Sequence, residues 1–229
     1  MISIIIPVYN QAEKLAKCLA SITAQSYQDF EIIIVNDGSS DDPRAWYEAY
    51  KGLLNDKISL IDQSNQGSNP ARNRGAREAR GQFLLFCDAD IIMKPEMLQL
   101  LLSALTEHPD KAYAYSGFKF GFKTFAPGDF SADKLRAGPF IHTSALMRTE
   151  AFPGFDNQIK RFQDWDLWLT ILERGGEGIF VNEMLFEVAS GGTISTWLPS
   201  FVYKLMPWLP AVKKYQRAMA VVKAKHGIV

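Results

Sequence analysis

The sequence predicts an α/β fold, in the form of a three-layer α/β/α sandwich around a central, mostly parallel sheet. Short apolar runs alternate with amphipathic helical patterns through the first half of the chain, and short loops join them. Strands and helices that alternate in this way form βαβ units. The right-handed crossovers of such units place helices on both faces of the sheet.

Four apolar runs predict the strands of that half, at residues 2–8, 31–35, 58–61 and 82–87. The second run is rich in β-branched residues, which is typical of a strand buried on both faces. Helices are predicted in the intervals, with an apolar stripe over residues 12–22 and a proline near the start of each later helix, at Pro43, Pro70 and Pro95. Proline suits the first helical turn because its missing N–H would have no partner there.

The second half is less regular. The aromatic segment 113–125 and the segment 140–147 are predicted as strands, and residues 179–181 as a short strand. Residues 163–174 form a helical pattern with Trp165 and Trp168 on its buried side.

The composition allows a large core, because 47% of the 229 residues are hydrophobic. The formal net charge of +0 argues against a general nucleic-acid binder, which needs a basic surface. The charge is uneven, since residues 196–229 hold six of the 25 basic residues and none of the 25 acidic ones. The rest of the chain therefore carries a formal charge of about −6.

The two cysteines, Cys18 and Cys87, lack the Cys-x-x-Cys spacing of a zinc site or redox pair, and we expect both to be small buried apolar groups. A reducing cytoplasm suits such thiols. The first residues show no basic region of a signal peptide, and no apolar run reaches the ~20 residues that span a bilayer. We therefore expect a cytoplasmic location.

In open α/β sheets, ligands bind beyond the carboxyl ends of the strands, which directs attention to residues 7–10, 36–41 and 88–90. Asp88 and Asp90 follow an apolar strand and offer two carboxylates at one point, which suits Mg²⁺ or Mn²⁺. Such an ion would lie between the protein and a diphosphate and neutralise its charge. Alternatively, the two acids only solvate a strand end.

Asp37 ends the second predicted strand and is followed by a glycine and two serines. Its carboxylate could accept a hydrogen bond from the imide N–H of a nucleotide base, beside a tight turn. The alternative is a turn capped by the aspartate alone. Tyr9 and Asn10, after the first strand, present the same two interpretations, because asparagine also caps helices well.

Residues 65–75 combine a flexible loop with a helix N-terminus, where backbone N–H groups attract anions. Arg72 and Arg74 add positive charge, and Gly75 permits close packing of the helix. A solvated basic helix face is the alternative interpretation.

Together these segments resemble family 2 glycosyltransferases. The segments 3–10, 35–41, 71–75 and 86–90 are similar to that family's motifs in order and spacing. Residues 154–156, followed by 163–168, resemble its acceptor-side motif. The similarity covers about residues 1 to 190.

The resemblance implies a GT-A fold and an inverting transfer of a sugar from a nucleotide diphosphate sugar, by default a UDP-sugar, to an acceptor hydroxyl in polysaccharide or cell-surface glycan synthesis. By analogy the nucleotide would contact Pro7, Tyr9, Asn10, Asp37, Arg72 and Asp88. Asp90 with Asp88 would hold the metal, and Asp164 would be the general base. The alternative for Asp164 is an acid that stabilises the first turn of its helix, and Asp166 is interpreted as the structural one of the two.

The implied organisation is a catalytic domain over residues 1–195, with a nucleotide-binding half at 1–92 and an acceptor-binding half at 93–195, followed by a basic amphipathic tail at 196–229. Three positions depart from the family pattern. Gln163 replaces a frequent Glu, Ile91 replaces a frequent acid, and no histidine follows Asp164 by some thirty residues, where Gly192, Thr193 or Ser195 could take its place. These departures leave the need for a metal open.

The alternating aromatic residues Phe118, Phe120, Phe122 and Phe125 predict a wall for a sugar acceptor, or equally a buried strand face. In the tail, the large apolar residues Trp197, Phe201, Leu205 and Trp208 lie among the basic ones. That pattern predicts peripheral attachment to an anionic inner leaflet, near a lipid-linked acceptor. Packing on the catalytic domain or in a homodimer is the other interpretation.

Two further functions compete. A haloacid-dehalogenase-like phosphatase also carries Asp-x-Asp after an apolar strand, but on the first strand of its fold, whereas here the motif follows the fourth. The second is a nucleotide-sugar-binding domain that has lost turnover, which the three departures from the family pattern favour.

Overall fold

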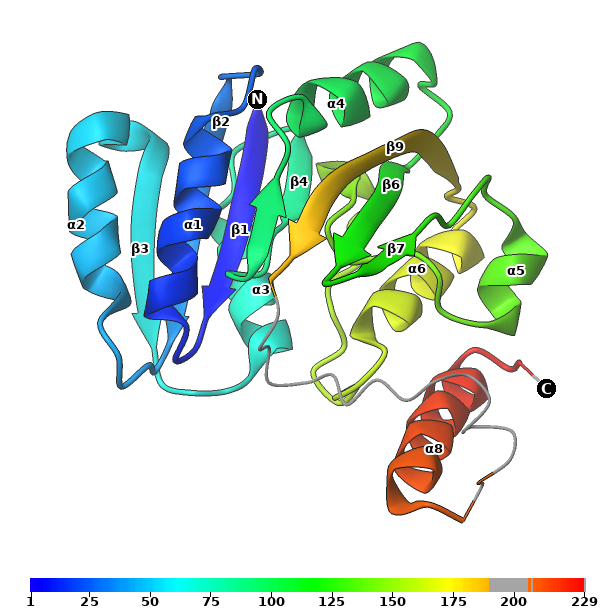
Figure 1. Cartoon of the computed structure of the whole chain (residues 1–229). Helices are drawn as coiled ribbons and strands as arrows, with labels where there is room; N and C mark the ends of the chain where they lie inside the picture. Colours follow the sequence, from blue (N-terminus) through cyan, green and yellow to red (C-terminus); the bar gives the residue numbers. More distant parts are fainter. Residues whose placement is uncertain (190–205, 207, 229) are drawn as a thin grey trace.

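The computed structural model describes residues 1–189, 206 and 208–228 (Figure 1). Within them, one nine-stranded sheet has the order β3-β2-β1-β4-β8-β6-β9-β5, with β7 beside β6. The strands are β1 (Ile2–Val8), β2 (Phe30–Asp37), β3 (Ile58–Gln63), β4 (Phe83–Phe86), β5 (Ile91–Met93), β6 (Tyr113–Phe120), β7 (Lys123–Phe125), β8 (Leu146–Arg148) and β9 (Gly178–Val188).

Helices lie on both faces of this sheet, as the sequence predicts (Figure 1). They are α1 (Ala12–Thr23), α2 (Pro43–Leu54), α3 (Ser68–Glu78), α4 (Met97–Glu107), α5 (Ala132–Ala137), α6 (Gln163–Glu173) and α8 (Pro210–Lys225), with short 3₁₀ turns at Asn55–Lys57 and Thr149–Ala151. No helix in the described part of the chain is both long and apolar enough to cross a membrane.

The sheet is mostly parallel. Strands β3, β2, β1 and β4 pair in parallel. Strand β8 then runs antiparallel between β4 and β6, and β6 pairs in parallel with β9. The short strands β5 and β7 are antiparallel additions. The carboxyl ends of β1, β2 and β4 therefore meet at one edge, which is where the sequence places its polar motifs.

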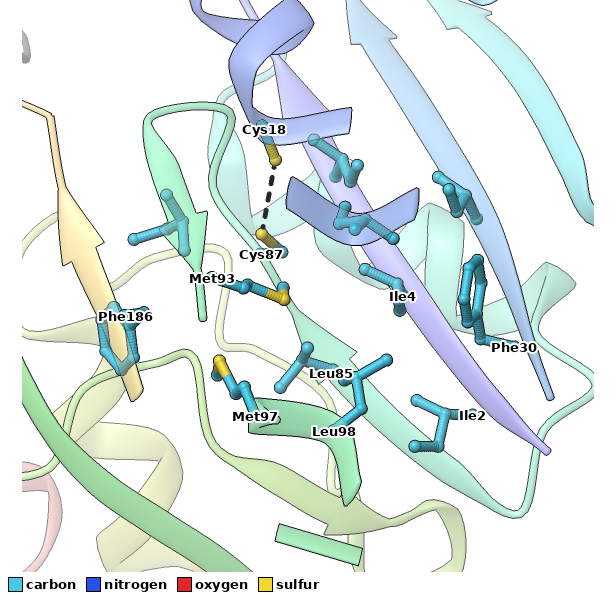
Figure 2. Packing of buried hydrophobic residues seen from close by; sticks show 14 of the residues in the cluster. Ile2, Ile4, Cys18, Phe30, Leu85, Cys87, Met93, Met97, Leu98 and Phe186 are labelled. Atoms are coloured by element: carbon cyan, nitrogen blue, oxygen red, sulfur yellow. Dashed lines mark hydrogen bonds between the residues drawn. The ribbon is translucent and has the colours of Figure 1, made fainter. Parts of the chain in front are cut away.

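The core divides between the two faces because β1 is buried along its whole length. Ile4 and Ile6 belong to a first cluster, on the face covered by α1 and α4. Ile5, between them, points to the opposite face and belongs to a second cluster, which includes the buried residues of α6. Figure 2 shows the first cluster, in which the sulfurs of Cys18 and Cys87 lie 3.6 Å apart and both residues are fully buried. The predicted interior role of both cysteines is confirmed.

Gly75 brings α3 close to the sheet. A Cβ atom at this position would lie 2.5 Å from Cγ2 of Ile5 and 3.2 Å from Cγ2 of Val35, closer than packed atoms approach. The expectation that this glycine permits close helix packing is confirmed.

The second half differs from the prediction in its details. Of the predicted strand 140–147, only residues 146 and 147 pair in the sheet, as part of β8 (Leu146–Arg148), whereas the short strand expected at 179–181 extends over Gly178–Val188. The segment 113–125 forms two strands that turn at Gly121, whose φ of +56° suits glycine. Helix α5 and strand β5 have no strong periodicity, so the sequence does not predict them.

The tail contains a helix, α8, whose Val222 is fully buried in the core cluster that contains Trp165 and Trp168. Two predictions fall on positions outside the described residues. These are the membrane contacts of Trp197, Phe201 and Leu205, and the replacement of the missing histidine by Gly192, Thr193 or Ser195. Trp208 is described and is 63% exposed.

Candidate functional site

A cavity of about 610 Å³ opens at the carboxyl ends of β1, β2 and β4. Its lining includes seven of the residues proposed from the sequence: Pro7, Tyr9, Asp37, Arg72, Asp88, Asp90 and Asp164. These residues come from the ends of three strands and from helices α3 and α6. The fold therefore brings together side chains that are up to 157 positions apart in sequence.

Asn10 is not among the residues that line this cavity. Its Oδ1 accepts hydrogen bonds from the backbone N of Ser40, at 2.8 Å, and from the Ser40 hydroxyl, at 3.1 Å. Its φ of +52° is of the kind that asparagine tolerates. The carboxamide therefore joins the loops after β1 and β2, in line with the turn interpretation, and a direct contact with nucleotide stays a prediction.

Asp37 is buried at the end of β2 and holds the loop that precedes α3. Its Oδ1 accepts hydrogen bonds from Nε2 of Gln63, at 2.8 Å, and from the backbone N of Gln66, at 2.9 Å. Its Oδ2 accepts one from the backbone N of Gly67, at 2.8 Å. A carboxylate oxygen has two acceptor sites, so Oδ2 keeps one for a ligand.

Gly67 has φ +97° and precedes the first residue of α3, Ser68. Both residues line the cavity, so the N-terminal end of α3 opens into it. The unpaired N–H groups of a helix start favour an anion there. This geometry agrees with the anion-binding role that the sequence predicts for residues 65–75.

Arg72 extends from α3 toward the end of β4. Its Nη2 donates to Oδ1 of Asp88 at 2.6 Å, and its side chain is only 3% exposed. Burial favours the neutral acid, but the guanidinium outweighs burial and holds the pKa of the Asp88 carboxyl below its usual value. Within the described chain, Nε of Arg72 is buried without a hydrogen-bond partner, which leaves one donor of this group unused.

Asp90 lies two residues further on, and the pKa of its carboxyl is raised, first by burial and then by the nearby charge of Asp88. No group of three or more His, Cys, Asp or Glu side chains in the described residues forms a ready metal site. Two carboxylates nevertheless fit Mg²⁺ or Mn²⁺ if water and phosphate oxygens complete the coordination shell, since Mg²⁺ is commonly bound in this way. The donor set is therefore suited to a metal that arrives with a nucleotide.

Asp164 is the second residue of α6, and the N-cap of this helix is Phe162, whose φ of +62° turns the chain into the helix. Burial raises the pKa of the Asp164 carboxyl. A raised pKa makes the carboxylate a stronger proton acceptor near neutral pH. Two indole N–H groups fix the helix beside it, because Trp165 donates to the carbonyl of Leu135 at 2.6 Å and Trp168 to that of Ile141 at 3.1 Å.

The segment 154–159 is fastened to α3. Nδ2 of Asn69 donates to the carbonyls of Asp156, at 2.8 Å, and Ile159, at 3.0 Å. Asn73 exchanges two hydrogen bonds with the backbone of Phe155, both at 2.8 Å. The motif around residues 154–156 thus connects α3, which contributes to the cavity lining, to the segment that leads into α6.

Aromatic side chains also contribute to the wall of the cavity. Phe118 stacks in parallel on Phe125, with ring centroids 4.8 Å apart, and on Phe186, at 5.1 Å. Phe118, Phe120 and Phe125 line the cavity, as the acceptor-wall prediction requires, whereas Phe122 is fully exposed at the β6–β7 turn.

His142 also lines the cavity, and sequence reasoning did not select it. Its Nδ1 accepts a hydrogen bond from the backbone N of Ser144 at 3.1 Å, so the neutral ring carries its proton on Nε2. Burial lowers the pKa of His142 to about 4. The residue lies in an irregular segment without periodicity, and only the fold brings it near Asp88.

Comparison with known families agrees with this geometry. Residues 3–159 match the family described as Glycosyl transferase family 2. The chain belongs to glycosyl transferase family 2. The resemblance noted in the sequence is therefore confirmed.

Relatives in this family cover different parts of the chain. The putative glycosyltransferase EpsE of Bacillus subtilis is 28% identical over 200 residues, which are 82% of this chain and 72% of EpsE. An uncharacterized glycosyltransferase of Nostoc is 42% identical over 101 residues, 44% of this chain and 31% of that protein. The chain thus spans less than two thirds of some relatives.

Solved structures of this family's fold are also similar. A fragment of S. aureus TarS in complex with UDP-GlcNAc has a TM-score of 0.74 at 19% identity, covering 92% of this chain and 66% of that one. The mannosyltransferase PcManGT of Pyrobaculum calidifontis, in complex with GDP-Man and Mn²⁺, has a TM-score of 0.71 at 18% identity, covering 97% and 75%. At these identities the likeness establishes the GT-A fold and no more.

Proposed function

We propose that this chain transfers a sugar from a nucleoside diphosphate sugar to an acceptor hydroxyl with inversion at the anomeric carbon. The observation that carries the proposal is the convergence of Asp37, the Arg72–Asp88 pair, Asp90 and Asp164 on one cavity. Family membership and the nucleotide-sugar complexes of structural neighbours support the same reaction class.

The nucleotide lies at the ends of β1 and β2 in this proposal. Tyr9 is half exposed at the cavity and offers a ring for the base, while the free acceptor site of Asp37 Oδ2 suits an imide N–H. Uracil has such an N–H, and a UDP-sugar is the donor we expect by default from the family resemblance. The diphosphate then lies near Arg72 and the start of α3, where positive charge and N–H groups favour it.

Asp88 and Asp90 would hold Mg²⁺ or Mn²⁺ together with the diphosphate oxygens. A bound divalent cation neutralises charge that develops on the departing nucleotide. The chain's own contribution at this point is the guanidinium of Arg72, which keeps Asp88 ionised and ready to coordinate.

Asp164 acts as the general base. The acceptor oxygen forms a bond to the anomeric carbon, the bond from that carbon to the diphosphate oxygen breaks, and the acceptor proton passes to Asp164. The nucleoside diphosphate leaves with the bonding electron pair, and one displacement of this kind inverts the anomeric centre. Alignment of the two substrates supplies much of the rate enhancement.

The acceptor lies against the wall formed by Phe118, Phe120 and Phe125, whose ring faces suit the C–H faces of a sugar. A glycan or lipid-linked glycan fits this wall, which makes polysaccharide or cell-surface glycan synthesis the process we propose.

Membrane attachment through α8 is a separate part of the proposal. Lys213, Lys214 and Arg217 are exposed on this helix, and Trp208 precedes it at 63% exposure. Each basic residue near an anionic surface contributes about 1 kcal/mol. We propose that the chain works in the cytoplasm at the inner leaflet, near a lipid-linked acceptor.

Flotation with vesicles tests this attachment. Wild type should float with vesicles that contain phosphatidylglycerol and not with phosphatidylcholine alone, and the triple change of Lys213, Lys214 and Arg217 to Gln should abolish flotation. Equal flotation with both vesicle types would contradict it. A concentration-dependent dimer that the triple change dissolves would assign the helix to a homodimer instead.

A phosphatase of the haloacid-dehalogenase type fits the site less well, because Asp88 would have to be the nucleophile and it is paired with Arg72. An inactive nucleotide-sugar-binding domain remains the main alternative, and activity separates it from an enzyme.

The test begins with a thermal-shift screen of UDP-GlcNAc, UDP-glucose and GDP-mannose with Mg²⁺ and Mn²⁺, since a ligand that binds only the folded state raises the melting temperature. Release of the nucleoside diphosphate is then measured with and without sugar acceptors. Asp164→Asn should slow release about 10²- to 10⁴-fold while it still binds nucleotide. Asp133→Asn, at an exposed position, is the matched control. An unchanged rate in Asp164→Asn would remove this residue from the mechanism, and binding without turnover in wild type would favour the inactive domain.

A further inference from the structure

The helix that carries Asp164 is held from outside the cavity by the end of α8. Asp166 lies two positions after Asp164, and residues so spaced point to different sides of a helix. The Asp166 side chain is 3% exposed and does not line the cavity. Its Oδ1 lies 2.7 Å from Nζ of Lys225 and 2.9 Å from Nε2 of His226.

Lys225 also joins α6 to the segment before it. Its Nζ lies 2.9 Å from Oδ2 of Asp156, the residue whose carbonyl accepts a hydrogen bond from Asn69 of α3. Burial lowers the pKa of Lys225, but hydrogen bonds to Asp166 and Asp156 outweigh burial and raise it above its usual value. One cation therefore ties the base helix to a segment already fastened to the nucleotide side.

His226 extends the contact along α6. Its Nδ1 lies 2.7 Å from Oε1 of Glu173, the last residue of the helix, and its side chain is 2% exposed. Val222, one turn earlier on α8, is fully buried in the core cluster that contains Trp165 and Trp168. The end of α8 thus holds both the first turn and the last residue of α6.

The Asp164 carboxylate accepts a hydrogen bond from the backbone N of Trp165, at 2.9 Å, so the direction of the carboxylate depends on the rotation and position of α6. The two indole bonds fix the sheet-facing side of that helix, and Lys225 and His226 fix the other. A displacement near 1 Å of a catalytic group can lower the rate about 10²-fold.

We propose that Lys225 and His226 are positioning residues for sugar transfer, which hold α6 so that Asp164 is aligned with the acceptor hydroxyl. The inference rests on the proposed function and deepens it, since it makes α8 part of the catalytic unit. It also gives a physical reason for the buried carboxylate of Asp166, which needs a cation because a buried charge without a partner is costly.

The test compares Lys225→Met, His226→Gln and Lys225→Arg with the exposed control Gln216→Met on the same helix. UDP-GlcNAc is the probe, with released UDP as the readout, and hydrogen exchange of the backbone amides of residues 163–168 is measured on the same samples. We expect Lys225→Met and His226→Gln to lower kcat more than 10-fold, with the donor KM and UDP affinity within two-fold. Their α6 amides should exchange faster, Lys225→Arg should retain most of the wild-type kcat, and Gln216→Met should match wild type.

Two results overturn the proposal. Lys225→Met with wild-type kcat and wild-type exchange in α6 means that the contact does not position the base. A loss of kcat that parallels a lower melting temperature and uniformly faster exchange means that the contact only stabilises the fold. If wild type releases no UDP or other nucleotide, the proposed function fails. Hydrogen exchange still tests the contact in that case, because faster exchange confined to α6 in Lys225→Met would show that Lys225 holds this helix.

Discussion

Nη2 of Arg72 donates to Oδ1 of Asp88 over 2.6 Å, so that a nearly buried cation of α3 meets the residue that follows β4 by two positions. The pair joins the two elements that bring the N-terminal end of α3 and the Asp-x-Asp motif to one cavity. Because Asp88 remains about one third exposed, its free oxygen is accessible to a metal or to a ribose hydroxyl.

Arg72→Met should destabilise the protein and weaken nucleotide binding. It leaves Asp88 without its cation at a partly buried position, and breaking such a pair costs about 3 kcal/mol. The pKa of Asp88 should rise, because burial still raises it while the lowering influence of Arg72 is gone. Urea unfolding measures the first effect and calorimetry with UDP the second. Arg74→Met, whose partner Glu78 is half exposed, should change stability by less than about 0.5 kcal/mol. Equal stability of the two variants would contradict this account.

The pH dependence of transfer should follow the raised pKa of Asp164. The base works as a carboxylate, so kcat/KM should fall as the pH drops through a pKa above the usual 3.8. This fall at acid pH should be absent from the residual rate of Asp164→Asn.

The stability of the fold should change with pH in the opposite sense. A folded-state pKa above the unfolded one means that the wild type loses stability as the pH rises from 3.8 through the folded pKa. Asp164→Asn should therefore be at least as stable as wild type at pH 7, and this advantage should disappear in acid. Thermal unfolding across pH measures it, and a variant less stable at pH 7 would contradict the burial argument.

The sequence predicts the parallel half of the fold well, because β1 and β2 are short buried runs rich in β-branched isoleucine, which favours strands. It also predicts most of the cavity, since strand ends of a parallel sheet share one edge. His142 and the contact of Lys225 with Asp166 are not predictable in this way. The first lies in a loop and the second joins residues that are 59 positions apart, so neither has a local pattern.

Removal of divalent metal should weaken nucleotide binding through the same two carboxylates. With EDTA, we expect the affinity for UDP to fall at least 10-fold, and Mg²⁺ or Mn²⁺ to restore it. In Asp90→Asn the metal should no longer restore affinity, because a neutral amide replaces one of the two charged ligands. Asp133→Asn, at an exposed position outside the residues that line the cavity, is the control. UDP binding that is equally tight in EDTA would show that Arg72 and the start of α3 suffice to hold the diphosphate. The departures from the family pattern, such as Ile91 after the Asp-x-Asp motif, would then reflect a site that works without metal.

Glu31, at the start of β2 and thus at the end of the sheet away from the cavity, should control acid stability. Its Oε1 accepts hydrogen bonds from Oγ of Ser3, at 2.6 Å, and from the backbone N of Arg80, at 2.7 Å, and its Oε2 accepts one from Nε of Arg80, at 2.9 Å. Burial raises the pKa of Glu31, but these bonds outweigh burial and lower it below the usual 4.5. The carboxylate therefore stabilises the fold above pH 4.5, and that contribution is lost as the pH falls through the lower, folded-state pKa.

Glu31→Gln should accordingly cost about 2 kcal/mol of unfolding free energy at pH 7, because a charged acceptor is replaced by a neutral one. The difference from wild type should shrink as the pH drops below 4.5, since the wild-type residue then becomes neutral as well. Urea unfolding at a series of pH values measures both, with the exposed Glu48→Gln as the control. Transfer activity per folded molecule should not change, because Asp37, not Glu31, is the β2 residue at the cavity. A pH-independent difference between Glu31→Gln and wild type would mean that shape, rather than charge, makes Glu31 stabilising.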